Sequence, residues 1–131
     1  MKLLSKQSDY ALQLVMDLPD KHAGTVLSIR DFCDSRNLSF AFMQRIVRSL
    51  RIAGIVDSVR GANGGYYLRA SISELQVIDI IRAVEPEFVS ACASGCKVAD
   101  SCKGKGAMQM IEKRVHDALH FSIATMKEGV C

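Results

Sequence analysis

Three of the five cysteines in the chain lie close together in one polar stretch, at Cys92, Cys96 and Cys102. Thiolates are soft ligands, and three of them on one flexible segment can hold a soft metal ion or an iron–sulfur cluster. Their spacing, Cys-x3-Cys-x5-Cys, differs from the Cys-x2-Cys pairs of zinc ribbons and suits a cluster better than a single zinc ion. The sequence therefore predicts a thiolate site that is one ligand short of the usual four.

The missing ligand is neither a cysteine nor a histidine of this stretch, because none follows the third thiol before His116. A row of Glu112, His116 and His120, one helical turn apart, could also bind a metal, but such a row is more often the solvated face of a helix. Cys33 is expected in the core and Cys131 at a mobile end. Candidates for the fourth ligand are Asp9, Glu85, Glu87, Asp100, His116 or a ligand from outside the chain.

Length and composition indicate a globular protein. The chain has 131 residues, of which 49% are apolar, which is enough for one domain or one domain plus an appendage. It contains no apolar run of about 18 residues, and Lys6, Gln7 and Asp9 interrupt the segment where a signal peptide would have its apolar core. We therefore expect a cytoplasmic protein. Thiols stay reduced in the cytoplasm, which favours metal-binding or redox-active cysteines over structural disulfides.

Basic charge is concentrated in one segment. Residues 36–69 contain six arginines and one aspartate, whereas residues 71–131 contain seven basic and eight acidic residues. Clustered arginines are expected of a surface that binds phosphates, although an ordinary solvated basic face would have the same composition.

The first half of the chain has the pattern of a helix-turn-helix. Apolar residues at helical spacing predict a helix from about Ser5 to Leu18, ended by Pro19. A short helix is expected over 28–35, and another from Ser39, its N-cap, to about residue 53. Two short helices joined by a tight turn, the second rich in arginine, are typical of DNA-binding proteins.

A β-hairpin is expected directly after this basic helix. Residues 55–60 and 66–69 can pair as strands, with the glycine-rich tip 61–65 between them. The predicted fold class is therefore mainly α with a small β-hairpin wing, that is, a winged helix-turn-helix. The glycines would let the tip approach a phosphate or a groove closely, although Asn-Gly-Gly is also simply a good hairpin turn.

The second half is expected to hold a helix from Ser73 to about Val84, stopped by Pro86, and a long helix from about Ala107 to Lys127. The long helix would span about 30 Å, and its apolar stripe exceeds what a small domain needs for its own core. The stripe predicts a partner helix from a second copy, and hence a homodimer. The expected units are a DNA-binding domain at 1–84, a cysteine-rich cluster loop at 85–106 and a dimerisation helix with a tail at 107–131.

The order of these elements resembles the IscR/NsrR-type family of bacterial iron–sulfur-dependent winged-helix transcriptional regulators, over nearly the whole chain. The resemblance rests on the three-cysteine loop together with four further segments: Ser8-Asp9-Tyr10-Ala11-Leu12, Leu50-Arg51-Ile52-Ala53-Gly54-Ile55-Val56, Val59-Arg60-Gly61-Ala62-Asn63-Gly64-Gly65-Tyr66 and Asp79-Ile80-Ile81-Arg82-Ala83-Val84-Glu85-Pro86.

The resemblance implies a homodimer with crossing C-terminal helices and a cluster held in each subunit by Cys92, Cys96 and Cys102. Lys105 stands where IscR-like members have a histidine ligand, whereas Asp9 stands where NsrR-like members supply an aspartate from the partner subunit. The NsrR-like branch and a 4Fe–4S cluster are therefore favoured, with 2Fe–2S as the alternative. A carboxylate is a hard, labile ligand for iron and suits a site that reacts with a small diatomic molecule.

The resemblance also implies the contacts to a palindromic DNA operator. Arg60 matches the wing arginine that reaches into the minor groove, and Gln44 replaces a family glutamate and can read adenine. Arg45 and Arg48 would contact guanine or phosphate. The full set of expected DNA-binding residues is Ser39, Gln44, Arg45, Arg48, Arg60, Asn63, Gly64 and Gly65.

The resulting hypothesis is a dimeric transcriptional regulator, a repressor, whose operator binding depends on a cluster that senses nitric oxide, redox state or iron–sulfur status. The alternatives are a cluster-free regulator that acts by thiol redox chemistry or zinc, and a metal or cluster carrier that does not bind DNA. An enzyme is not expected, because the sequence contains no nucleophile–base pair and no phosphate-binding glycine motif.

Overall fold

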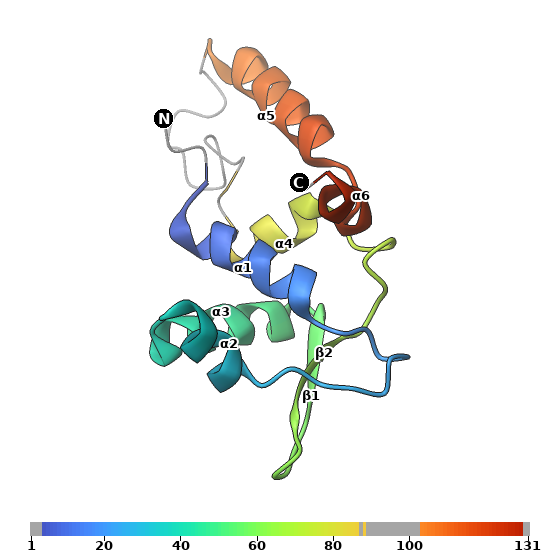
Figure 1. Ribbon diagram of the computed structural model, residues 1–131. Coiled ribbons are helices and arrows are strands. Elements are labelled where there is room, and N and C mark those ends of the chain that lie inside the picture. Colours follow the sequence, from blue (N-terminus) through green and yellow to red (C-terminus); the bar gives the residue numbers. More distant parts are fainter. Residues whose placement is uncertain (1–3, 87, 89–102, 130–131) are drawn as a thin grey trace.

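The computed structural model describes residues 4–86, 88 and 103–129. The predictions made for the three loop cysteines, Glu87, Asp100 and Cys131 fall outside the described residues. The elements in chain order are α1 (Lys6–Asp17), α2 (Ile29–Arg36), α3 (Phe40–Ile52), β1 (Val56–Val59), β2 (Gly65–Leu68), α4 (Val77–Val84), α5 (Lys105–Leu119) and α6 (Ile123–Glu128) (Figure 1). None of the described helices is long and apolar enough to cross a membrane.

Helix α1 forms where its apolar spacing predicts it. The Ser5 hydroxyl oxygen accepts a hydrogen bond from the backbone N–H of Ser8, which caps the helix. The helix ends at Asp17, just before Pro19, and buries Ala11, Leu14 and Val15 completely.

The helix-turn-helix is confirmed, and side chains define its boundaries. Ser28 caps α2 and Ser39 caps α3, each by accepting a backbone N–H three residues on. Between the two helices Asn37 adopts the left-handed conformation at φ 53°. At the end of α3, Gly54 has φ 77° and the N–H of Ile55 bonds to the carbonyl of Leu50, which is a Schellman motif.

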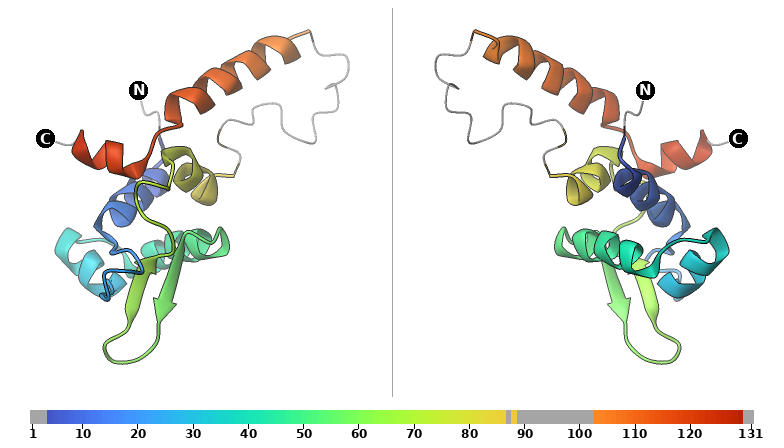
Figure 2. Two further views of the ribbon diagram at one scale, coloured as in Figure 1. Left: turned by 90° about the vertical axis from the view of Figure 1, so that its right-hand side faces the viewer. Right: turned by 90° about the vertical axis from the view of Figure 1, so that its left-hand side faces the viewer.

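The hairpin is antiparallel and projects from the helical body, as the side views in Figure 2 show. Its register pairs Val56 with Leu68 and Val59 with Gly65. Leu27, from the segment between α1 and α2, forms an antiparallel bridge with Tyr66 through backbone hydrogen bonds in both directions, each 2.9 Å. Strand β2 is therefore covered on its second edge by the chain that leads into α2.

The packing of the chain itself requires glycines at the hairpin tip. A Cβ atom on Gly64 would lie 2.2 Å from the carbonyl oxygen of Val59, and one on Gly65 would lie 2.6 Å from that of Leu27. Gly61 has φ 120°, which L side chains rarely adopt. These residues must be glycine for the tip to close, whatever else the tip contacts.

Helix α4 begins later than predicted. Its N-cap position is Gln76, and Ser73, expected as the cap, lies in the preceding turn with its hydroxyl 2.7 Å from that of Ser71. The expectation was wrong because Leu75 and Gln76 lie outside the helix, and Gln76 forms an antiparallel bridge with Ser122. The N–H of Val77 bonds to the carbonyl of Phe121, and that of Ile123 to the carbonyl of Leu75. Tertiary pairing has overridden the local capping signal.

The single helix predicted over 107–127 is two helices. Helix α5 ends at Leu119, and Ser122 caps α6 by accepting the N–H of Thr125. The break occurs because residues 121–123 join the extended pair with residues 75–77, which places Ile123 in the core with no exposed surface. In Figure 2, α5 extends away from the rest of the body, while α6 lies against it.

The core lies where α1 and α3 pack against α4. Its members are mostly aliphatic, with Leu14, Met43, Leu50 and Ile81 fully buried. Ser8 is the one buried polar side chain among the described residues, and its hydroxyl donates to Glu85 Oε1 at 2.6 Å. Ser5 donates to the same oxygen. This junction holds the end of α4 against the first turn of α1, where the positive end of the helix dipole also favours a carboxylate.

We predict that Gly64→Ala lowers the free energy of unfolding by about 1–3 kcal/mol, because the new methyl group must displace the backbone of the tip. Urea denaturation measures the loss. Asn63→Ala, at the exposed neighbouring position, is the matched control and should stay near the wild-type value. Equal stability of the two variants would contradict the tight tip.

We also predict that Ser8 and Glu85 are coupled energetically. Glu85→Ala should cost about 1–3 kcal/mol, because the buried hydroxyl of Ser8 loses its acceptor. In a double-mutant cycle the pair should show a coupling of roughly 0.5–3 kcal/mol. The same cycle between Ser8 and Glu74, which instead accepts from the backbone of Ser71, should be additive. If the effects of the Ser8 and Glu85 substitutions on the free energy of unfolding were simply additive, the two side chains would not be coupled and the proposed junction would be refuted.

Candidate functional site

Helix α3 separates its side chains into a buried face and a basic face. Met43, Ile46, Val47 and Leu50 are buried against the neighbouring helices. The same periodicity leaves the other face to solvent. Its exposed members, which we call the basic face, are Gln44, Arg45, Arg48 and Arg51. The structure thus brings three of the residues predicted to contact DNA, Gln44, Arg45 and Arg48, onto one surface and adds Arg51.

The basic face continues onto the hairpin. A hollow of about 330 Å³ is lined by Gln44, Arg45, Val47, Arg48, Arg51 and Tyr66. Tyr66 belongs to β2, so the hollow joins the recognition helix to the wing. Sequence reasoning assigned no role to Tyr66, and its place next to the wing glycines was the signal that could have found it.

Aromatic rings position several of the arginines. The Arg45 guanidinium lies 5.9 Å from the centre of the Phe42 ring, and Phe42 in turn packs edge-to-face on Tyr10 at 5.8 Å. On α2, Arg36 lies over the Phe32 ring and pairs with Asp17. Arg36 is therefore engaged within the fold, and the phosphate-binding charge expected over residues 36–69 comes from α3 and the wing instead.

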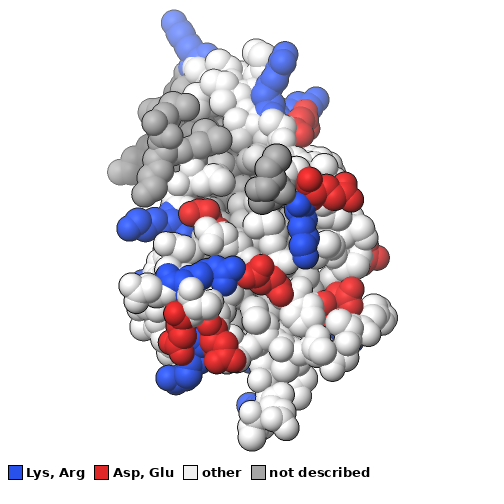
Figure 3. Space-filling view, in the orientation of Figure 1, with Lys and Arg blue, Asp and Glu red and all other residues white. Residues whose placement is uncertain are grey.

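The wing residues lie at the projecting end of the hairpin. Arg60 and Asn63 are exposed, whereas Gly64 and Gly65 are half-buried, because each approaches a backbone carbonyl of the chain. Ser39 is exposed, but its hydroxyl is used as the cap of α3. Figure 3 shows one face of the molecule, on which acidic and basic side chains alternate over the helices and no acidic side chain appears on the projecting end of the hairpin.

Among the described candidates for the fourth ligand, Asp9 is exposed, whereas Glu85 and His116 are half-buried. Asp9 lies in the first turn of α1, and its Oδ1 accepts a hydrogen bond from Gln13 Nε2 at 3.2 Å. Glu85 is occupied by the hydroxyls of Ser5 and Ser8. Cys33 is 2% exposed, as expected of a core residue, and burial, with Asp34 nearby, raises the pKa of its thiol. Its thiolate is therefore disfavoured.

The described histidines do not complete a metal centre. The rings of His116 and His120 stack with their centres 5.4 Å apart. Among the residues that the structure describes, no group of three or more histidine, cysteine or acidic side chains is arranged to hold a metal ion.

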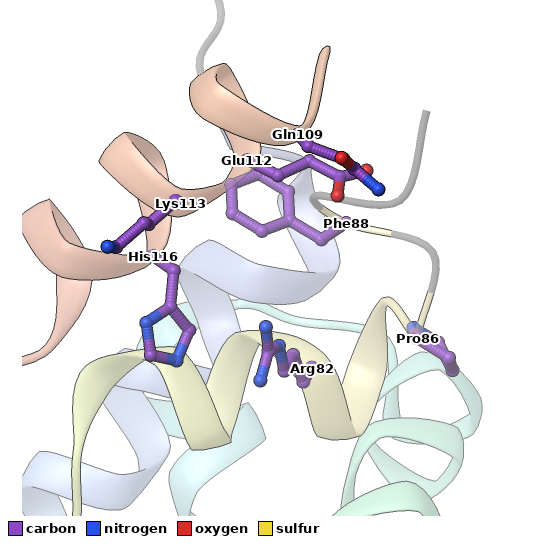
Figure 4. Close-up of a pocket in the computed structure, with 7 residues that line it drawn as sticks. All are labelled: Arg82, Pro86, Phe88, Gln109, Glu112, Lys113 and His116. Carbon is purple, nitrogen blue, oxygen red and sulfur yellow. The ribbon is translucent and has the colours of Figure 1, made fainter. Parts of the chain in front are cut away.

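A second, larger hollow lies between α4 and α5. It measures about 610 Å³ and is lined by Arg82, Pro86, Phe88, Gln109, Glu112, Lys113 and His116. Figure 4 shows Arg82 and His116 reaching into it from opposite helices, with the Phe88 ring beside Glu112. Sequence reasoning treated Glu112 and His116 as a solvated row and missed this hollow. The spacing of Gln109, Glu112, Lys113 and His116 on one helical face was the available signal.

Comparison with known proteins agrees with the winged helix-turn-helix. A family model described as "Rrf2: Iron-dependent Transcriptional regulator" matches residues 4–128. The HTH-type transcriptional regulator CymR of Bacillus subtilis (strain 168) is 35% identical over 82 residues, which cover 63% of this chain and 59% of that protein. The match therefore spans less than two thirds of the length of this relative.

Two solved structures extend the likeness to the whole fold. The structure of CymR, described as the global cysteine regulator of B. subtilis, superposes with a TM-score of 0.76 at 26% identity and covers 100% of both chains. T. potens IscR superposes with a TM-score of 0.71 at 27% identity, covering 95% of this chain and 85% of that one. These relatives are regulators, which confirms the expectation that the chain is not an enzyme. Because the family model spans almost the entire chain, the protein belongs to the Rrf2 family of transcriptional regulators.

Proposed function

We propose that the protein is a homodimeric repressor that binds a palindromic DNA operator. An iron–sulfur cluster held by the protein controls this binding. The observation that carries DNA recognition is the basic face of α3, which is continuous with the wing through the hollow at Tyr66. A helix with this exposure fits the major groove of B-DNA, which is about 12 Å wide. The hairpin then meets the adjacent backbone or minor groove.

The chemistry of each side chain suits it to a different contact with DNA. Arg48 and Arg45 carry bidentate guanidinium groups that suit guanine or phosphate, and the Gln44 amide suits adenine. Arg60 and Asn63 stand on the projecting tip and would contact the minor groove. The fixed tip, closed by Gly64 and Gly65, keeps these two side chains at a constant distance from α3.

The homodimer is supported by the apolar face of α5. Met110 is 59% exposed and Ile111 is 54% exposed, so two adjacent large apolar side chains of α5 face water. A second copy, packed against this face, would remove both from water. Two-fold symmetry would then place two α3 helices against two half-sites, as a palindromic operator requires.

The cluster is proposed from the chemistry of the donor set. Cys92, Cys96 and Cys102 supply three soft thiolates, and Asp9 is exposed and thus accessible to a cysteine segment of the partner subunit. A 4Fe–4S cluster held by these four side chains would supply a redox-active centre that reacts with oxidants or nitric oxide. Asp9 holds its place on α1, one residue from the Tyr10 ring that packs on Phe42 of α3. A change at Asp9 therefore reaches the recognition helix through two aromatic rings.

A cluster-free thiol regulator is the second candidate. It is favoured by the likeness to CymR, whose structure is described as that of a global cysteine regulator. In that case the three loop cysteines would form disulfides instead of holding iron. Oxidation would join two thiols with loss of two electrons and two protons to an external oxidant.

We predict that Arg48→Ala weakens binding to operator DNA by about 1–3 kcal/mol and lowers the salt dependence of the binding constant by about one unit if the contact is to phosphate. Fluorescence anisotropy at several salt concentrations measures both, on DNA selected from a random palindromic pool by the wild-type protein. Lys127→Ala, an equal charge change at an exposed position of α6, is the control and should bind normally. If both variants weakened DNA binding equally, the effect would be one of general charge, and the basic face would not be the surface that contacts the bases.

We predict that the anaerobically purified protein contains iron and sulfide, and that Cys92→Ala, Cys96→Ala or Cys102→Ala removes most of both. Asp9→Ala, which keeps the three thiolates, should hold the cluster more weakly and change its response to nitric oxide. Asp31→Ala, at an exposed first-turn position of α2, is the control. Iron-free protein with intramolecular disulfides would favour the thiol regulator, and equal DNA affinity with and without the cluster would refute cluster control.

A further inference from the structure

The inward face of α5 is polar, which is the reverse of the usual arrangement of a surface helix. Gln109, Glu112, Lys113 and His116 follow the i, i+3, i+4, i+7 spacing and line the hollow toward α4. Ile111 and Val115 lie on a different face, about 120° away around the helix at 100° per residue. Glu112 and His116 are half-buried and Gln109 and Lys113 are exposed, while on the other face Val115 is half-buried and Ile111 is 54% exposed.

The hollow contains opposite charges that do not neutralise each other. Arg82 enters it from α4 and Glu112 from α5, and these two side chains form no ion pair within 4 Å. Two opposite charges that face one cavity from different elements, and that form no ion pair with each other, would bind a molecule that carries both complementary charges. Lys113 and His116 line the same wall as Glu112, on α5, and His116 faces Arg82 across the hollow (Figure 4).

The remaining wall is apolar. Pro86 and Phe88 close the end of the hollow where the chain leaves α4, and the Phe88 ring is half-buried (Figure 4). The volume of about 610 Å³ lies within the range of small-molecule sites. An apolar group between Phe88 and Pro86 would lose contact with water while the charged end of the same molecule reached Arg82 and Glu112.

We propose that the hollow between α4 and α5 is a binding site for a small amphoteric molecule with an apolar side group, of the class of the free α-amino acids. Its carboxylate is held by Arg82, its ammonium group by Glu112, and its side group lies against Phe88. The residues that line this site differ from those of the hollow beside the basic face of α3.

The test is binding of the twenty free L-amino acids to the full chain, screened by thermal shift and quantified by calorimetry. At least one with an apolar side chain should bind, and for L-leucine two analogues separate the contributions. 4-Methylpentanoate lacks the ammonium group and 3-methylbutylamine lacks the carboxylate, and both should bind at least tenfold more weakly. Absence of binding by every amino acid up to roughly 10 mM would overturn the proposal.

Variants test the assigned contacts. Arg82→Gln and Glu112→Gln should each weaken binding of the best amino acid at least tenfold, with an unchanged circular dichroism spectrum. Arg114→Gln on α5 and Asp79→Asn on α4 make equal charge changes at exposed positions outside the hollow and should leave binding intact. Binding that survives both Arg82→Gln and Glu112→Gln would place the ligand elsewhere and overturn the site.

Discussion

Burial of one face of α3 against α1 and α4 is the constraint on which the rest of the molecule depends. Met43 and Leu50, two turns apart on one face of α3, have no exposed surface. Because the core around them is closely packed, the helix can rotate very little about its axis. The exposed direction of Gln44, Arg45 and Arg48 follows from this burial. The Schellman motif at Gly54 then ends the helix sharply and starts β1 four residues after Ile52, which aims the wing at the same surface as the arginines.

Most of this DNA-binding half could be predicted from sequence because its signals are local. Caps at Ser5, Ser28 and Ser39, the left-handed residue at Gly54 and apolar spacing on α1 and α3 all concern residues a few positions apart. Local signals failed where distant segments pair. Ser73 has the sequence of a cap, yet α4 begins only at Val77, because residues 75–77 bond to residues 121–123. The same pairing divides the expected last helix.

The candidate sites show the same difference between local signals and contacts of distant segments. The basic face was predictable because a single helix carries it, and the arginines alternate with buried apolar residues. Tyr66 and the hollow between α4 and α5 were not, because each combines elements that are remote in sequence. The glycines of the tip were expected to favour DNA contact, and the structure adds an internal reason: the carbonyls of Val59 and Leu27 leave no room for a Cβ atom. The requirement for glycine at these positions of the chain therefore needs no reference to DNA.

The pairing of residues 75–77 with 121–123 has a mechanical consequence for α5. This helix is joined to the body next to its C-terminal end, whereas its first turn lies at the far end, about 22 Å away at 1.5 Å per residue over 15 residues. Any swing of α5 relative to the body would therefore be a rotation about His120–Ser122. A rotation of about 10° about these residues moves the far end by about 4 Å, as follows from the same helical rise. Small adjustments beside α4 are thus amplified at the start of α5, the end that follows the cysteine segment in the chain.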